Sequence, residues 1–186
     1  MTKPTISKGV ADVYHIRTPD GDFAAVYIEH GSYASHGTTN YWVRVASTGS
    51  FGTYGTYWNS VGSDHVSFLT GIDFDYAMKN LTSYKHREFD LDESVKQAKV
   101  WLFVERRRED LTKEEAREAF DVLLEVSGTN SKDAFVNSLL ESNLPFFNEC
   151  YEWIVCERYK SDCVGFWENI WSVLVKQLQE EKNAKQ

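Results

Sequence analysis

The chain has 186 residues, of which 26% are charged, 42% are hydrophobic and 15% are aromatic, and its formal net charge is -8. This composition excludes an intrinsically disordered chain, and no apolar stretch reaches the length of a membrane-spanning helix. The acidic balance argues against a general binder of nucleic acids or anionic membranes, which need a basic surface. Three cysteines without a signal peptide indicate a reducing, cytoplasmic compartment rather than a disulfide scaffold.

Residues 1–62 are predicted to form a β-rich part, an antiparallel meander of three or four strands. Runs of β-branched and aromatic residues alternate there with turns that contain Gly, as is typical of strands. Alternation along the third run places Tyr41, Val43 and Val45 on one face of the sheet and Trp42 on the other. The predicted strands are Val13–Arg17, Phe23–Glu29, Thr39–Ala46 and Phe51–Trp58, and His30–Thr38 is expected to be a loop.

Residues 63–186 are predicted to be helical, because the sequence after residue 80 is rich in charge and has only two of the 11 glycines. Ser63 or Asp64 is expected to cap a first helix. Capping boxes that start at Asp90 and Thr112 predict two helices joined as a hairpin. Further helices are predicted over Phe74–Leu81, Ala134–Leu140, Phe146–Tyr159 and Val164–Glu181.

Together these elements predict an α+β fold, with an N-terminal antiparallel sheet of three to four strands followed by about five helices. We expect a single domain over residues 1–186 with one core. A chain of this length buries roughly 70% of its unfolded surface, which is enough for a stable domain without metal or disulfides.

A histidine after the last predicted strand is a candidate general base. His65 stands beside Asp64 and upstream of Asp73, and a carboxylate can orient an imidazole for proton transfer. The competing interpretation is that Asp64 caps a helix and His65 occupies its first turn, because adjacent side chains point in different directions. A metal-dependent nuclease or hydrolase that uses His65 with Asp64 or Asp73 is therefore the alternative function.

The remaining histidines and the cysteines follow no metal-binding pattern. The spacing of His30 and His36 fits no standard ligand pair, although His15 is expected on a neighbouring strand. The three cysteines are separated by five and six residues, which matches no zinc or redox motif. We therefore predict neither a metal site nor a cofactor.

The only basic run of the sequence, Arg106 with Arg107 and Arg108, stands at the end of a predicted helix. Such a run could bind phosphate, so a nucleic-acid-binding accessory protein is a second alternative. Cations also stabilise the C-terminus of a helix, and acidic residues flank the run. A solvated helix end is the favoured interpretation.

The aromatic residues of the third and fourth predicted strands are the least ordinary feature of the sequence. Tyr and Trp dominate the energetics of protein interfaces, and stacked aromatic rings can also bind bases. A base-stacking platform is disfavoured because few basic residues accompany the rings, whereas packing under the helices is a simpler alternative. The predicted partner-binding residues are Tyr41, Trp42, Tyr54, Tyr57 and Trp58.

Three segments resemble a group of small phage and prophage proteins of uncharacterised function. They are WNSVGSDHVSFL from Trp58 to Leu69, the helical hairpin around Arg106–Phe120, and GFWENIW from Gly165 to Trp171. The resemblance implies an accessory protein made in the cytoplasm of the bacterial host cell, and it supplies no catalytic residues.

From these observations we expect a non-enzymatic accessory protein that binds a host protein, with inhibition of a bacterial defence system as one expected role. The acidic charge, the surplus of Trp and Tyr and the lack of a coherent catalytic set favour this function. No membrane partner is expected, nucleic acid is not favoured, and the sequence indicates no oligomeric state.

Overall fold

The computed structural model describes residues 6–184 except 7, 63, 127 and 130, so that Ser63, one of the two predicted caps, lies outside the described residues. The contacts within the chain divide it into two compact units. Unit 1 comprises residues 1–86 and 159–186, and unit 2 is the segment 87–158 between them.

Unit 1 contains the predicted antiparallel sheet, which has four strands in the order β1-β2-β3-β4. The strands are β1 (Asp12–Arg17), β2 (Phe23–Ser35), β3 (Thr38–Gly49) and β4 (Gly52–Trp58). The predicted loop over His30–Thr38 is wrong, because β2 and β3 continue their pairing as far as Ser35 and Thr38. The turn is only His36-Gly37, and both residues have positive φ, a conformation that matches the twist of a tight hairpin.

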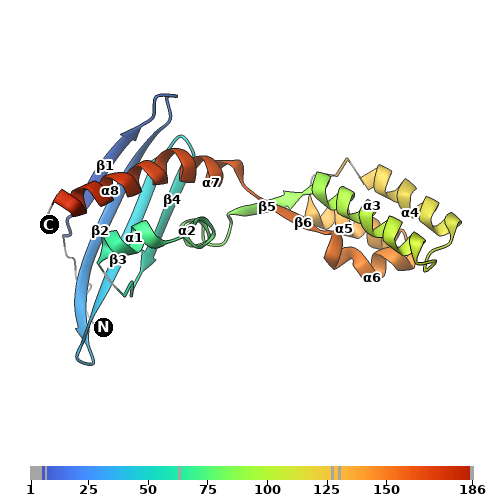
Figure 1. The fold of residues 1–186 in the computed structure, drawn as a ribbon, viewed down its shortest axis with the longest axis horizontal. Helices are drawn as coiled ribbons and strands as arrows, with labels where there is room; N and C mark the ends of the chain where they lie inside the picture. The colour runs from blue at the N-terminus through green and yellow to red at the C-terminus, as the bar shows by residue number, and fades with distance from the viewer. Residues whose placement is uncertain (1–5, 7, 63, 127, 130, 185–186) are drawn as a thin grey trace. The chain divides into compact units, whose positions relative to one another are not determined.

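The helices of unit 1 lie across one face of this sheet (Figure 1). They are α1 (His65–Gly71), α2 (Phe74–Leu81), α7 (Ser161–Gly165), the π-helical segment η1 (Phe166–Trp171) and α8 (Ser172–Ala184). The Asp64 and Asp73 carboxylates cap α1 and α2 by accepting the N–H groups of Ser67 and Tyr76, both at 2.9 Å. The core between sheet and helices includes Val26, Ile28, Val43, Val45, Leu69, Met78, Phe166, Trp171 and Leu174.

Unit 2 is built from α3 (Leu91–Arg107), α4 (Lys113–Val126), α5 (Lys132–Glu141) and α6 (Pro145–Ile154). The predicted hairpin of α3 and α4 is confirmed. Thr112 and Glu115 form a complete capping box, in which each residue's side chain accepts the other's N–H group. These helices have a hydrophobic core of their own, with Ala98, Leu123, Phe135, Leu139, Phe147 and Ile154 fully enclosed.

A short sheet replaces the end of one predicted helix. The sequence predicted a helix over Phe146–Tyr159, but α6 ends at Ile154, and β6 (Cys156–Tyr159) pairs with β5 (Arg87–Asp90). The Cys156 N–H group donates to the Ser94 hydroxyl at 2.8 Å, which supplies a partner for the backbone outside the helix. This long-range contact redirects the chain, and it leaves no trace in the local sequence.

Two clusters of buried hydrophobic residues, one in each unit, replace the single core that the sequence indicated. The boundary also differs from the expected division at residue 62, because α1, α2, α7, η1 and α8 belong with the sheet. That the two units behave as a single domain stays a prediction.

Candidate functional site

The sheet of unit 1 has a second face, here called the outer face, which points away from α1, α2 and α8. Along β3, Val43, Val45 and Ser47 are buried against the helices, whereas Arg44 and Ala46 between them are exposed. Val13, Phe23, Tyr27 and Tyr57 lie on the outer face and keep between 40% and 54% of their surface exposed. Within unit 1 the outer face is therefore accessible to a partner.

An aromatic and charged cluster is preformed on this face. Strand pairing sets Gly31 opposite Trp42, and it aligns Glu29, Arg44 and Tyr57 in one row across three strands. The Arg44 guanidinium pairs with the Glu29 carboxylate at 2.8 Å and lies 5.4 Å from the centre of the Tyr57 ring. The Trp42 and Tyr57 rings are 5.9 Å apart.

Gly31 allows the indole of Trp42 to lie across β2. A β-carbon at Gly31 would approach the indole to 2.8 Å, which is closer than carbon atoms pack. On the other side of the Glu29–Arg44 row, strand pairing sets Tyr27 opposite Ala46, which in turn faces Gly55. Small residues beside large rings give this part of the sheet a stepped surface on which a partner side chain can pack.

The structure divides the predicted partner-binding residues between the two faces of the sheet. Trp42 and Tyr57 lie on the outer face, as the alternation along β3 predicted for Trp42. Tyr54 and Trp58 are only 7% and 6% exposed and belong to the core beneath the helices. Tyr41 is exposed on the helix-facing side, and its carbonyl accepts the Val61 N–H at 2.9 Å.

His65, the candidate base, lies beside a different carboxylate from the two that the sequence suggested. Asp64 and Asp73 serve as helix caps, and the hydrogen bonds from Ser67 lower the pKa of Asp64 to about 2. The His65 ring stacks on His30 with centroids 3.5 Å apart, and His30 Nε2 lies 3.5 Å from Asp12 Oδ2. The sequence missed this group because its members come from β1, β2 and α1.

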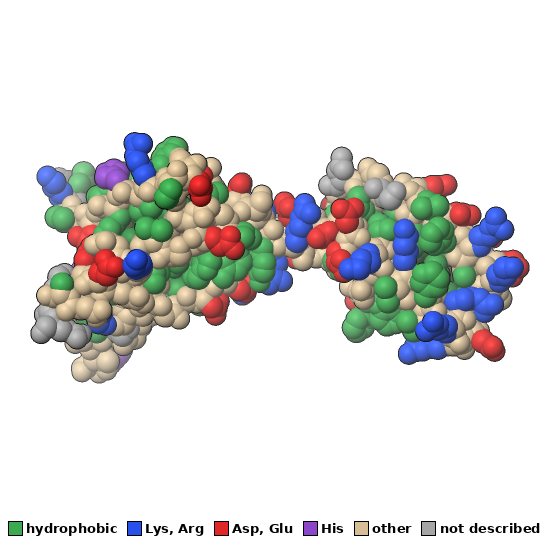
Figure 2. All heavy atoms as spheres, turned by 45° about the horizontal axis from the view of Figure 1, so that its top comes forward, with side chains coloured by type: hydrophobic (Ala, Val, Ile, Leu, Met, Phe, Trp, Pro, Cys, Tyr) green, Lys and Arg blue, Asp and Glu red, His purple; other side chains and the backbone are tan. Residues whose placement is uncertain are grey.

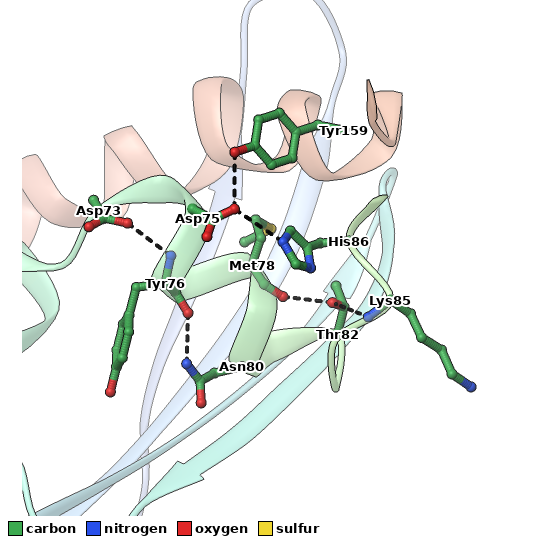
Figure 3. Close-up of polar contacts among 9 residues, drawn as sticks. All are labelled: Asp73, Asp75, Tyr76, Met78, Asn80, Thr82, Lys85, His86 and Tyr159. Atoms are coloured by element: carbon green, nitrogen blue, oxygen red, sulfur yellow. Dashed lines mark hydrogen bonds and ion pairs between the residues drawn. The ribbon is translucent and has the colours of Figure 1, made fainter. Parts of the chain in front are cut away.

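A polar network in unit 1 fastens the two points where the chain leaves and re-enters the unit (Figure 3). Asp75 Oδ1 accepts the Tyr159 hydroxyl at 3.0 Å and lies 3.2 Å from His86 Nε2. The His86 carbonyl also accepts the Lys160 N–H at 3.0 Å. His86 is 7% exposed, so its side chain helps to hold the chain ends in place and presents little surface to a ligand.

The basic run stands at the end of α3, as predicted, and its side chains are exposed. Arg106 donates to the Leu111 carbonyl at 3.2 Å, and Arg108 pairs with Glu105 at 3.3 Å. Both contacts are made within the end of α3 and the turn that follows this helix. The run therefore has the contacts of a helix end, and a role in binding nucleic acid stays a prediction.

Unit 2 carries a pocket of about 300 Å³ that the sequence did not indicate. Its apolar lining includes two tryptophans, and four carboxylates stand among the lining residues, an arrangement that suits a cationic group. The lining includes Trp101, Trp153, Leu111 and Phe146 together with Glu105, Asp110, Glu115 and Glu149.

The chain belongs to the phage family Phage_phiTE_072, whose model matches residues 5–180. No curated protein and no solved structure matches it. Across the described part of the chain, none of the helices combines the length and the apolar character needed to cross a membrane.

Proposed function

We propose that this phage protein acts in the bacterial cytoplasm by binding a host protein through the outer face of its sheet, and that the complex inhibits a bacterial defence system. The observation that supports this function most strongly is the preformed cluster of Trp42, Arg44 and Tyr57 on an accessible sheet face. Trp, Tyr and Arg are the residue types that dominate binding energy at protein interfaces.

The cluster suits an interface because its side chains are already ordered. Arg44 is held by both Glu29 and the Tyr57 ring, and Trp42 lies against Gly31. Binding therefore immobilises few rotamers, and little conformational entropy is lost when a partner docks. Substituting these residues should weaken the complex more than substituting the mobile side chains at the edge of the sheet.

The charge of the outer face selects the kind of partner. Arg17 and Arg44 lie on it with Glu29, so the face is slightly basic although the chain carries a net charge of -8. Figure 2 is turned by 45° from the view of Figure 1, in which helices lie in front of the sheet, and on that other side acidic and basic side chains are interspersed with hydrophobic ones. A host protein with carboxylates around an apolar patch complements this face, whereas a polyanion is repelled by the chain as a whole.

The test is to capture host proteins from a bacterial lysate on the immobilised chain and to titrate the purified partner. Trp42→Ala and Tyr57→Ala should each weaken binding at least tenfold, since each removes a central anchor. Tyr84→Ala is the matched control, because Tyr84 is an exposed aromatic residue outside the sheet. Trp58→Ala is unsuitable, because it would remove a core side chain.

Two results would contradict this assignment. One is a partner whose affinity survives both outer-face substitutions, and the other is a partner lost with Trp153→Ala, which would place the contact at the pocket of unit 2. The proposed inhibition has its own measurement. Cells that carry a defence system and express the chain should plate a restricted phage more efficiently than cells that express Trp42→Ala.

A metal-dependent hydrolase centred on His65 remains the alternative function, because His65 lies next to His30 and Asp12. Nuclease and phosphatase assays with and without Mg²⁺ or Zn²⁺ test it. Activity that disappears in His65→Ala and persists in Cys156→Ala would favour the hydrolase.

The third alternative is nucleic-acid binding through Arg106–Arg108 and the sheet. It predicts an affinity for DNA or RNA that falls steeply as the salt concentration rises. Titrations that show no binding at low salt would exclude this alternative.

A further inference from the structure

We propose that Asp12, His30 and His65 form a binding site for one divalent transition-metal ion of the zinc type. Each residue offers one ligand atom, and the three atoms lie within 4.8 Å of one another. They come from the start of β1, the middle of β2 and the first turn of α1. Three segments far apart in the sequence thus bring a set of ligands together that suits this class of ion.

The ligand atoms are near enough to bind one tetrahedral ion once the stacked histidine rings turn apart. Bonds of about 2.0–2.1 Å from Zn²⁺ to nitrogen and oxygen place neighbouring ligand atoms roughly 3.3 Å apart. The distance between His30 Nε2 and Asp12 Oδ2 is already 3.5 Å. Asp12 and His30 are exposed side chains, so the rotations that bring the third ligand to this distance meet little resistance.

The ligand types select the ion. Two imidazoles and one carboxylate favour Zn²⁺ and related transition metals, whereas Mg²⁺ and Ca²⁺ prefer oxygen ligands throughout. His30 links the other two residues, because its ring stacks on His65 and its Nε2 lies 3.5 Å from the Asp12 carboxylate. A cation accounts for all three side chains.

The charge around the cluster matches a divalent cation. The adjoining pocket, of about 370 Å³, is lined by the carboxylates of Asp12, Asp64 and Glu181 and by the ammonium of Lys182, which gives a net charge of -2. Asp64 accepts hydrogen bonds from Ser67 and Lys182, and Glu181 accepts one from the Tyr14 hydroxyl. These contacts hold the two carboxylates in place at the pocket.

Three protein ligands leave a fourth position on a tetrahedral ion for water or a small ligand. The cluster lines the 370 Å³ pocket, so that position can open toward it. The Tyr14 hydroxyl, which donates to Glu181 at 3.1 Å, also lines this pocket. A site of this kind is suited to hold a ligand as well as to stabilise the fold.

The test is a titration of the metal-free, untagged full chain with ZnCl₂ by calorimetry, together with the absorption spectrum of the Co²⁺ form. We expect one ion per chain and the intense visible bands of tetrahedral Co²⁺. His30→Ala, His65→Ala and Asp12→Ala should each weaken Zn²⁺ binding at least tenfold. His15→Ala is the matched control, because His15 is a β1 histidine on the outer face.

The inference is overturned if 100 µM Zn²⁺ fails to bind, or if His30→Ala and His65→Ala together leave the affinity unchanged. It is also overturned if Cys156→Ser rather than the histidine substitutions removes the ion. Circular dichroism of each variant shows whether its fold is intact, and His65→Gln replaces His65→Ala if that variant unfolds. The zinc titration contains no partner protein, so its result is independent of partner binding.

Discussion

Gly49 and Gly71 show how differently the same substitution acts at two positions. A β-carbon at Gly49 would lie 2.1 Å from the Phe23 carbonyl oxygen, whereas one at Gly71 would meet no atom within 4 Å. The atom in the way at Gly49 belongs to the backbone of a paired strand, so the hairpin itself would have to move. At this position glycine is required by the close approach of β2 and β3.

We therefore predict that Gly49→Ala lowers the free energy of unfolding by about 1–3 kcal/mol, in the range of overpacked sites. Gly71→Ala should leave it unchanged to within about 0.5 kcal/mol, as for open surface positions. Urea denaturation of both variants and the wild type measures the difference. Equal midpoints for the two variants would contradict the close approach at Gly49.

Cys150 is predicted to be an unreactive thiol. Burial raises its pKa to about 12, so the thiolate that reacts with disulfide reagents is a minute fraction at pH 8. Cys156 is only half-buried and lies in β6 rather than in the helix predicted over Phe146–Tyr159.

In native protein at pH 8, we expect Cys156 to react with a chromogenic disulfide reagent well before Cys150. Adding guanidinium unfolds the protein, so the remaining thiols should then react at once. The Cys156→Ser variant identifies the fast phase. A fast phase that persists in this variant would show that a buried thiol is accessible.

At the scale of the element, Asp64 determines where α1 begins. Its carboxylate accepts both the N–H and the hydroxyl of Ser67, and these bonds depress its pKa to about 2. Because the folded-state pKa is below the unfolded value, the charged carboxylate stabilises the fold at neutral pH. That contribution is lost as the pH falls from about 4 through 2.

Asp64→Ala should lower the free energy of unfolding by about 1 kcal/mol at pH 7, the usual cost of losing an N-cap. The gap to the wild type should narrow between pH 4 and pH 2. Asp64→Asn retains a capping oxygen and should recover much of the loss at pH 7. Denaturation curves at the three pH values make the comparison, and a gap that stays constant down to pH 2 would contradict the role of the charge.

Elements whose signals are local could be predicted from the sequence. The bounds of α2 and the capping box at Thr112 and Glu115 follow from the hydrogen-bonding preferences of residues three apart. Alternation along β3 correctly separated Trp42 from Val43. In these cases a few neighbouring residues contain the information that fixes the structure.

The rest depends on contacts between distant segments. The pairing of Asp12 with Ile28 sets His30 two residues further along the same face of β2, and α1 then adds His65. No spacing within the sequence reveals this register. Likewise, β6 replaces a helix because Ser94 and β5 meet it from elsewhere in unit 2.

At the scale of the whole molecule, unit 2 is inserted between two segments of unit 1. The chain leaves at His86 and returns at Tyr159, and the hydrogen bond from Lys160 to the His86 carbonyl brings these points together. A short linker can therefore span the gap without distorting the sheet.

We predict that replacing residues 87–158 by a short Gly-rich linker leaves a folded unit 1. Its far-ultraviolet circular dichroism should show the sheet and the remaining helices, and it should unfold cooperatively on heating. A truncated protein without a cooperative transition would instead support the single domain expected from the sequence. The isolated segment 87–158 provides the complementary sample.

The insertion also determines the order in which the two units can complete their folding during synthesis on the ribosome. Unit 2 is continuous, so it has all of its residues before the last helices have left the ribosome. The sheet cannot be fully covered until α8 has been synthesised, because Leu174 and Leu178 complete the core that α1 and α2 begin. Until then the nascent chain exposes an apolar strand surface of the kind that chaperones bind. A premature stop before Leu174 would therefore leave unit 2 complete and the β-sheet only partly covered.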